Sequence, residues 1–204
     1  MTDERHGVTT GIVVAGGRST RFGEGEKALA DLDGRPMLAH VVATLAAASD
    51  GVVVNCRPDQ RAAFADALSG TDVAWALDAR PDEGPLAGLA RALSAVDTDR
   101  AVVLGCDMPL AEADALAGLR SRLGDSDAVV PRTEGGPEPL HATYRVGPTL
   151  AAARATLEDG KRSLRALLDR LEVEFVAAGE GVPARSLTSL DTPGQLREVD
   201  GTAE

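Results

Sequence analysis

The sequence predicts an α/β protein in which helices cover a mostly parallel, buried sheet. Two observations lead to this prediction. Short apolar runs rich in β-branched residues alternate along the chain with longer amphipathic segments. Within several of the short runs, such as those at residues 11–15, 51–56 and 101–106, the apolar residues are continuous, which is typical of strands buried on both faces of a parallel sheet. The 204 residues suffice for one sizeable core, so we expect a single domain over residues 1–204, with its core at about 8–199.

The individual elements follow from these two patterns in chain order. Seven apolar runs are expected to form strands, and an eighth, extended run to complete the set, at residues 11–15, 51–56, 73–77, 101–106, 127–131, 141–146, 173–177 and 185–190. Amphipathic spacing predicts helices at residues 37–48, 58–68, 85–96, 112–123, 148–158, 163–171 and 193–199. Several of these helices begin with proline, which the first turn accommodates because its N–H groups need no partner within the helix.

Acidic residues outnumber basic ones by 32 to 21, which gives a formal net charge of −11. A chain of this charge repels nucleic acids and anionic membranes, so we expect neither as a partner. The abundance of Asp, Glu and Ala resembles proteins from a salt-rich cytoplasm, where an acidic surface serves solvation. No run approaches the ~20 apolar residues of a membrane-spanning helix, and the polar start MTDERHGVTT has no apolar signal core. We therefore expect a cytoplasmic protein.

Three side chains that could carry chemistry are interpreted first as structural. Cys56 and Cys106 each end an apolar run and form no CxxC pair. They are expected to be small buried residues rather than zinc ligands, with a catalytic thiol as the alternative. His141 lies in a predicted strand without a Ser or Cys nucleophile pattern, so a structural role is favoured over contact with a substrate.

The loop after the first predicted strand, VVAGGRSTRFGEGEK over residues 13–27, has the properties of an anion-binding site. It matches neither the dinucleotide fingerprint nor the P-loop spacing. Gly16 and Gly17 allow the backbone to approach a ligand and present its N–H groups, while Arg18, Arg21 and Lys27 add positive charge. Lys27 is one of only two lysines among 21 basic residues, which favours a compact charge placed close to a phosphate. The alternative is a turn with solvated arginines.

Polar residues also follow three other predicted strands. Asp107 comes after AVVLGC, where a carboxylate at the end of a central strand could hold Mg²⁺ and bridge it to phosphates. Asp78 ends VAWALD and could accept hydrogen bonds from a ribose or a base. Asn55 ends its strand at the same edge, and its amide both donates and accepts. For each carboxylate the alternative is the capping of a helix or a turn.

Together these motifs resemble the molybdenum cofactor guanylyltransferases. The resemblance rests on AGGRSTRFG…EK, VVVNCR, EGPLAGL, GCDMPL, PLHATYR and SLDTPGQL, and it spans about residues 8–199. The first motif alone is shared with sugar-phosphate, isoprenoid and cobinamide nucleotidyltransferases, whereas the ordered combination is more specific. The resemblance implies a single Rossmann-like three-layer domain of the nucleotide-diphospho-sugar transferase type, with helices on both faces of its sheet.

The resemblance also implies roles for individual residues. Nucleotide-binding positions fall at Val14, Ala15, Gly16, Gly17, Lys27, Asn55, Asp78 and Asp107. Catalytic positions fall at Arg21, Lys27 and Asp107, of which Asp107 would hold the metal, Mg²⁺. Residues that border the substrate cleft fall at Gly84, Pro85, Leu86 and Gly88. Ser189 and Asp191 stand where relatives often have asparagines, and Asp191 could instead supply a second carboxylate towards the metal.

The implied reaction is a Mg²⁺-dependent guanylyl transfer. The terminal phosphate of molybdopterin, or of Mo-molybdopterin, attacks the α-phosphate of GTP and pyrophosphate leaves. Candidate protein partners are a molybdate-insertion protein and apo-molybdoenzymes. Alternatives are cytidylyl transfer to the same pterin, guanylyl transfer to another phosphate, and a non-catalytic carrier of nucleotide or cofactor. Cytidylyl relatives usually read Ala-Ala-Gly after the first strand, so Ala15-Gly16-Gly17 favours guanine.

Overall fold

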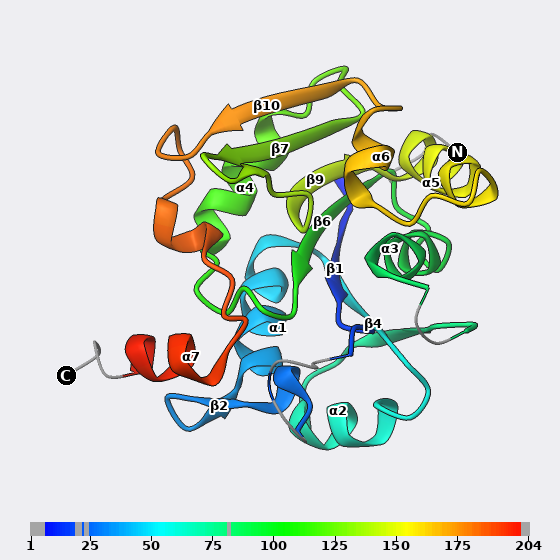
Figure 1. The fold of residues 1–204 in the computed structure, drawn as a ribbon. Helices are drawn as coiled ribbons and strands as arrows, with labels where there is room; N and C mark the ends of the chain where they lie inside the picture. The colour runs from blue at the N-terminus through cyan, green and yellow to red at the C-terminus, as the bar shows by residue number, and fades with distance from the viewer. Residues whose placement is uncertain (1–6, 19–21, 23–24, 81–82, 201–204) are drawn as a thin grey trace.

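The computed structural model describes residues 7–18, 22, 25–80 and 83–200, and among them one large sheet forms the centre of the molecule (Figure 1). Its strands lie in the order β10-β7-β9-β6-β1-β4-β5, with β8 paired to β7. Their bounds are β1 Thr9–Val14, β4 Gly51–Cys56, β5 Ala74–Leu77, β6 Arg100–Gly105, β7 Ala128–Thr133, β8 Gly136–Pro137, β9 His141–Arg145 and β10 Val173–Ala177. The predicted α/β class with a mostly parallel sheet is confirmed.

Strand direction divides the sheet into two regions. β1 pairs in parallel with β4 and β6, and β4 pairs in parallel with β5. β9 runs antiparallel to both of its neighbours, β6 and β7, while β10 pairs in parallel with β7. Every residue of β1 is buried, as expected for a strand covered on both faces.

Helices cover both faces of the sheet because neighbouring residues of each strand point to opposite sides. Ile12 packs in one apolar core with α3 (Pro85–Leu93), α5 (Val146–Glu158) and α6 (Leu164–Leu168). Its neighbour Val13 packs in a second core with α1 (Met37–Ala48), α2 (Arg61–Ala67) and α4 (Ala113–Arg122). Figure 1 shows α3 and α5 on one side of β1 and α1 on the other. The predicted three-layer arrangement is therefore confirmed.

The strand predicted at 185–190 is wrong. Residues Ala184–Leu187 form a short 3-10 helix instead, and no strand of the sheet pairs with this segment. Pro183 precedes the turn, and the buried Ser186 hydroxyl accepts a hydrogen bond from the backbone N–H of Glu112 at 3.1 Å. These local contacts hold the segment close to the start of α4.

Several short elements are absent from the prediction because two or three residues carry no periodic pattern. They are a 3-10 turn, Lys27–Leu29, and two two-residue strands, β2 (Asp31–Leu32) and β3 (Arg35–Pro36), that pair with each other. The C-terminal helix α7 (Pro193–Asp200) lies near β2 in Figure 1. Leu190, just before α7, packs in a small apolar cluster with Leu32 and Met37. The last segment of the chain is thus joined to the segment that follows the glycine loop.

The chain changes direction across the sheet at β1. After β1 it forms β4 and then β5 on one side, and it returns to form β6 on the other side of β1. In open α/β sheets ligands bind beyond the carboxyl ends of the strands at such a switch point. This point lies where β1 leads into Gly16 and β6 leads into Asp107. Among the residues that the structure describes, no helix has both the length and the apolar run needed to cross a membrane.

His141 on β9 is fully buried, and in the described part of the chain neither ring nitrogen has a hydrogen-bond partner. It does not line the large cleft described below. Burial lowers the pKa of this imidazole from 6.5 to about 4, so the ring is neutral at pH 7. The side chain is therefore part of the core, in agreement with the structural role favoured from the sequence.

Acid is expected to destabilise the fold through His141. Because the pKa is lower in the folded chain, the unfolded chain takes up the proton first as the pH falls. The neutral ring contributes fully to the free energy of unfolding above about pH 6.5. This contribution, about 3 kcal/mol, is lost as the pH falls towards 4. Urea unfolding at a series of pH values should show a smaller loss for His141→Leu than for the unmodified protein. Equal losses in the two proteins would contradict this assignment.

Candidate active site

A cleft of about 690 Å³ opens at the carboxyl ends of β1, β4, β5 and β6. Most of the residues predicted to bind the nucleotide line it: Val14, Gly16, Gly17, Lys27, Asn55, Asp78 and Asp107. Ala15 is buried in the core beside the cleft, and its backbone N–H donates to the Asn55 carbonyl at 2.9 Å. Arg21 lies outside the described residues, so its predicted role stays a prediction. The residues dispersed along the sequence thus meet at the switch point of the sheet.

Lys27 lies between two carboxylates at one end of this cleft. Its ammonium donates to Oδ2 of Asp107 at 3.0 Å and to Oδ1 of Asp191 at 2.6 Å. Burial disfavours the charge of Lys27, but the attraction of Asp107 and hydrogen bonds to both carboxylates outweigh it and raise its pKa. Lys27 is therefore cationic throughout the physiological pH range.

The backbone holds Asp191 in this position from the far end of the chain. The N–H of Leu190 donates to the Asp107 carbonyl at 2.8 Å, which ties the two carboxylate-bearing segments together. The Gln195 side chain accepts from the N–H groups of Asp191 and Thr192 at 2.8 and 3.0 Å. From the sequence, Asp191 was only an alternative, as a second carboxylate towards the metal. In the structure its carboxylate accepts a hydrogen bond from Lys27, as that of Asp107 does.

A second polar group lies where β1, β4 and β5 end. The Asn55 amide donates to Oδ1 of Asp78 at 2.7 Å and to the Ala76 carbonyl at 3.0 Å. Its Oδ1 is buried and has no hydrogen-bond partner among the residues that the structure describes. An unpaired buried acceptor is costly unless a ligand or water completes it. The pair Asn55–Asp78 therefore brings the carboxylate of Asp78 to the edge of the cleft, while Oδ1 of Asn55 is enclosed beside Gly88.

Two glycines make room for this pair. A Cβ at Gly16 would lie 2.2 Å from Oδ2 of Asp78, and a Cβ at Gly88 would lie 2.3 Å from Oδ1 of Asn55. Both distances are far shorter than any van der Waals contact, so only glycine fits while Asn55 and Asp78 keep their places. Gly88 lies on α3, which covers this end of the sheet.

Residues at the start of α3 also line the cleft. Gly84 has φ +83°, a left-handed conformation that favours glycine, and Pro85 follows in the first turn. Gly84, Pro85 and Gly88 line the cleft, as expected from the sequence. Leu86 points instead into the core and is fully buried.

The two cysteines remain poor nucleophiles in this setting. Burial, followed by the negative charge of Asp107, raises the pKa of Cys106 to about 12, although this residue lines the cleft. Burial and the charge of Asp78 likewise raise the pKa of Cys56 to about 12. Since the thiolate is the reactive form, neither residue is suited to covalent catalysis at neutral pH.

Fold and cleft together define a class of protein. A glycine loop, a lysine between two carboxylates and a pair of polar acceptors meet at the switch point of a Rossmann-like sheet, an arrangement suited to a nucleoside triphosphate. This is the class of the nucleotidyltransferases. A family model described as the MobA-like NTP transferase domain matches residues 11–174, and the chain belongs to this family.

Individual relatives agree with the family. A protein of Natronomonas pharaonis named probable molybdenum cofactor guanylyltransferase is 41% identical over 196 residues, which cover 95% of this chain and 97% of that one. The molybdenum cofactor guanylyltransferase of Pseudomonas putida is 34% identical over 193 residues, 92% of this chain and 95% of that one. The crystal structure of molybdopterin-guanine dinucleotide biosynthesis protein A from Archaeoglobus fulgidus has the same fold, with TM-score 0.78, 23% identity and coverage of 95% and 97%.

Proposed function

We propose that this protein transfers GMP from GTP to the phosphate of molybdopterin or Mo-molybdopterin and releases pyrophosphate. The observation that carries the proposal is the pairing of two sites in one cleft. The acceptor pair Asn55–Asp78 lies at one end, and the cluster of Lys27 with its two carboxylates lies at the other. The names of the relatives from Natronomonas pharaonis and Pseudomonas putida support the same reaction.

The acceptor pair supports guanine as the base. Guanine carries an N1–H and an exocyclic amino group side by side, so its edge offers two adjacent donors. The carboxylate of Asp78 lines the cleft and can accept from both donors, and the Asn55 amide holds it in place. The corresponding edge of cytosine offers one donor beside two acceptors and would leave a carboxylate facing an acceptor.

The glycine loop and Lys27 would hold the triphosphate. Backbone N–H groups after Gly16 can approach phosphate oxygens closely, and Lys27 brings a full positive charge to the same cleft. We propose that Arg21 adds a further charge to the leaving pyrophosphate. The acceptor phosphate is already anionic, so the reaction needs in-line positioning and charge neutralisation rather than a general base.

The donor set also fits Mg²⁺. Asp107 and Asp191 both form ion pairs with the ammonium of Lys27, so their carboxylate oxygens lie close together. Mg²⁺ prefers hard oxygen ligands of this kind. Among the described residues no group of three or more His, Cys, Asp or Glu side chains could hold a metal by itself. One or two carboxylates together with substrate phosphates are a usual Mg²⁺ site. When bound there, the ion would neutralise charge on the reacting phosphates.

We place this reaction in the cytoplasm, where GTP is available, with a molybdate-insertion protein or apo-molybdoenzymes as recipients of the product. The test is direct: purified protein, Mg²⁺ and molybdopterin are incubated with GTP or CTP, and the dinucleotide product and pyrophosphate are followed together. Equimolar product and pyrophosphate from GTP, with at least a tenfold preference over CTP, are expected. A preference for CTP, or binding of GTP without pyrophosphate release, would overturn the proposal.

A further inference from the structure

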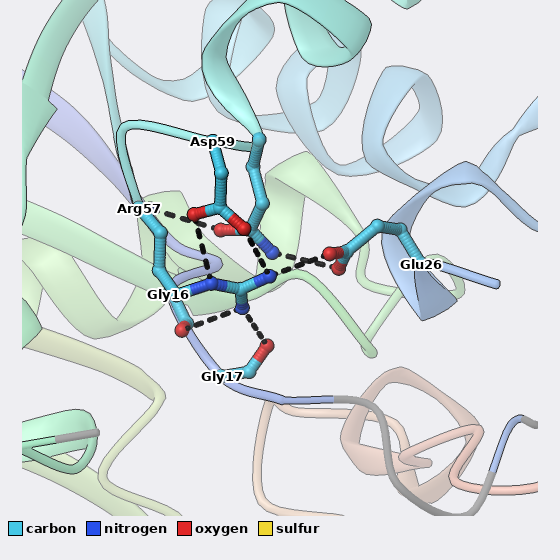
Figure 2. A network of polar contacts seen from close by, with 6 residues as sticks. Gly16, Gly17, Glu26, Arg57 and Asp59 are labelled. Carbon is cyan, nitrogen blue, oxygen red and sulfur yellow. Dashed lines mark hydrogen bonds and ion pairs between the residues drawn. The ribbon is translucent and has the colours of Figure 1, made fainter. Parts of the chain in front are cut away.

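Arg57 lies directly behind the glycine loop. It follows the last residue of β4, its side chain is only 7% exposed, and it is not among the residues that line the cleft. One guanidinium nitrogen, Nη1, donates to the carbonyls of Gly16 and Gly17 at 3.1 and 2.8 Å. The other, Nη2, donates to Oε1 of Glu26 at 2.6 Å (Figure 2). A single side chain thus joins the start of the loop to the residue before Lys27.

Further hydrogen bonds fix the guanidinium in this position. The second carboxylate oxygen of Glu26 accepts from the Gln60 amide at 2.7 Å, and Gln60 in turn accepts from the backbone N–H of Arg57 at 2.9 Å. Nε of Arg57 donates to Asp59 at 3.2 Å (Figure 2). The planar fork of an arginine places its donors on three nitrogens in fixed directions, whereas the three donors of a lysine share one nitrogen.

The two carbonyl contacts determine where the neighbouring N–H groups point. In a planar trans peptide the carbonyl and the N–H of the next residue point in opposite directions. Arg57 draws the carbonyls of Gly16 and Gly17 to the rear of the loop, so the N–H groups of Gly17 and Arg18 are turned the other way. Gly17 and Arg18 both line the cleft.

We infer that Arg57 is a positioning residue for the triphosphate of the nucleotide. It touches no substrate; it acts by holding the N–H groups of Gly17 and Arg18 towards the cleft and by tying Glu26, and with it Lys27, to the same guanidinium. This inference rests on the proposed nucleotidyl transfer, because it assigns the loop to phosphate groups. Donors oriented before binding need no reorganisation when the anion arrives, and this favours affinity.

Removal of the guanidinium should therefore weaken triphosphate binding. In Arg57→Ala we expect the Kd for inorganic tripolyphosphate and the KM for GTP to rise about 10- to 100-fold. The KM for molybdopterin should change far less, because Arg57 orients N–H groups that bind the nucleotide triphosphate and not the acceptor. Arg57→Lys should recover only part of the loss. Arg61→Ala is the matched control and should behave like the unmodified protein; it removes a guanidinium of α2 that lies over the ring of Trp75 on β5.

Two readouts separate positioning from a loss of folding and from a failure of the proposed function. Deuterium uptake by a peptide covering residues 11–18 should be faster in Arg57→Ala without any ligand. Glu26→Ala should weaken tripolyphosphate binding in the same sense, and the double variant should lose little more than Arg57→Ala, since both act on one network. Unchanged tripolyphosphate affinity in Arg57→Ala or Arg57→Lys would overturn the inference. Tripolyphosphate has no base, so absence of GMP transfer by the unmodified protein would overturn the proposed function instead.

Discussion

Replacement of Asp107 by alanine is expected to lower kcat for GMP transfer by about 1,000-fold or more while part of the GTP affinity remains. The carboxylate of Asp107 lies at the end of β6, 3.0 Å from the ammonium of Lys27, and it is a proposed ligand of Mg²⁺. Its loss would remove one of the two carboxylates proposed to hold the ion beside the reacting phosphates. Asn55 and Asp78, which are proposed to bind the base, remain in Asp107→Ala, so GTP should still bind. Single-turnover rates and GTP titrations measure the two effects separately.

Two further variants serve as a control and a comparison for this result. Asp66→Ala removes an exposed carboxylate from α2, away from the cleft, and should leave the rate unchanged. Asp191→Asn keeps an oxygen ligand at the second position and should lower the rate much less than Asp107→Ala. If transfer by Asp107→Ala proceeds at the rate of the unmodified protein, Asp107 has no part in the mechanism.

Replacement of Gly16 by alanine is expected to lower kcat/KM for GTP by about 100-fold. The added Cβ would lie 2.2 Å from Oδ2 and 3.2 Å from Cγ of Asp78, so the carboxylate and the methyl group cannot occupy these positions together. The displaced carboxylate would lose the contact proposed for it with the donor edge of guanine. Since cytosine does not require that carboxylate, the ratio of kcat/KM for GTP over CTP should fall as well. Steady-state kinetics with both nucleotides measure these changes.

The clash itself can be tested with a double variant. In an Asp78→Ala background the oxygen that Gly16→Ala would strike is gone, so the second substitution should have little additional effect. Gly118→Ala is the matched control: it also adds one methyl group, in α4, and meets nothing within 4 Å. Additive losses in the double variant would show that Gly16 acts through something other than Asp78.

Much of this fold was predictable from periodicity alone. The helix at residues 37–48 and the strand at residues 51–56 have the predicted bounds, because long helical patterns and continuous apolar runs are strong signals. The strand predicted at 185–190 failed for the opposite reason. Its six residues were read as a short extended run, but the Ser186 hydroxyl accepts a hydrogen bond from the N–H of Glu112, 74 residues away, and a sequence pattern does not reveal that contact.

The candidate site was predictable where a residue follows a strand directly. Asn55, Asp78 and Asp107 lie at strand ends, and parallel strands bring such ends to one edge of a sheet. Two residues were harder to place. Asp191 reaches Lys27 through a segment without regular structure, and Arg57 acts from behind the loop, where only three-dimensional contacts distinguish it from a solvated arginine. In the sequence, the one sign of a role for Arg57 was its place in the VVVNCR motif.

The ion pair between Lys27 and Asp191 also bears on the order of events during synthesis. These residues are 164 positions apart, and ribosomes add about 5–20 residues per second, so Lys27 is made roughly 8 to 33 s before its partner. During that interval a nascent chain can already contain the glycine loop, Asn55, Asp78 and Asp107. The second carboxylate arrives with the segment that packs Leu190 against Leu32 and Met37. A segment translated well after the glycine loop therefore completes the pair of carboxylates around Lys27.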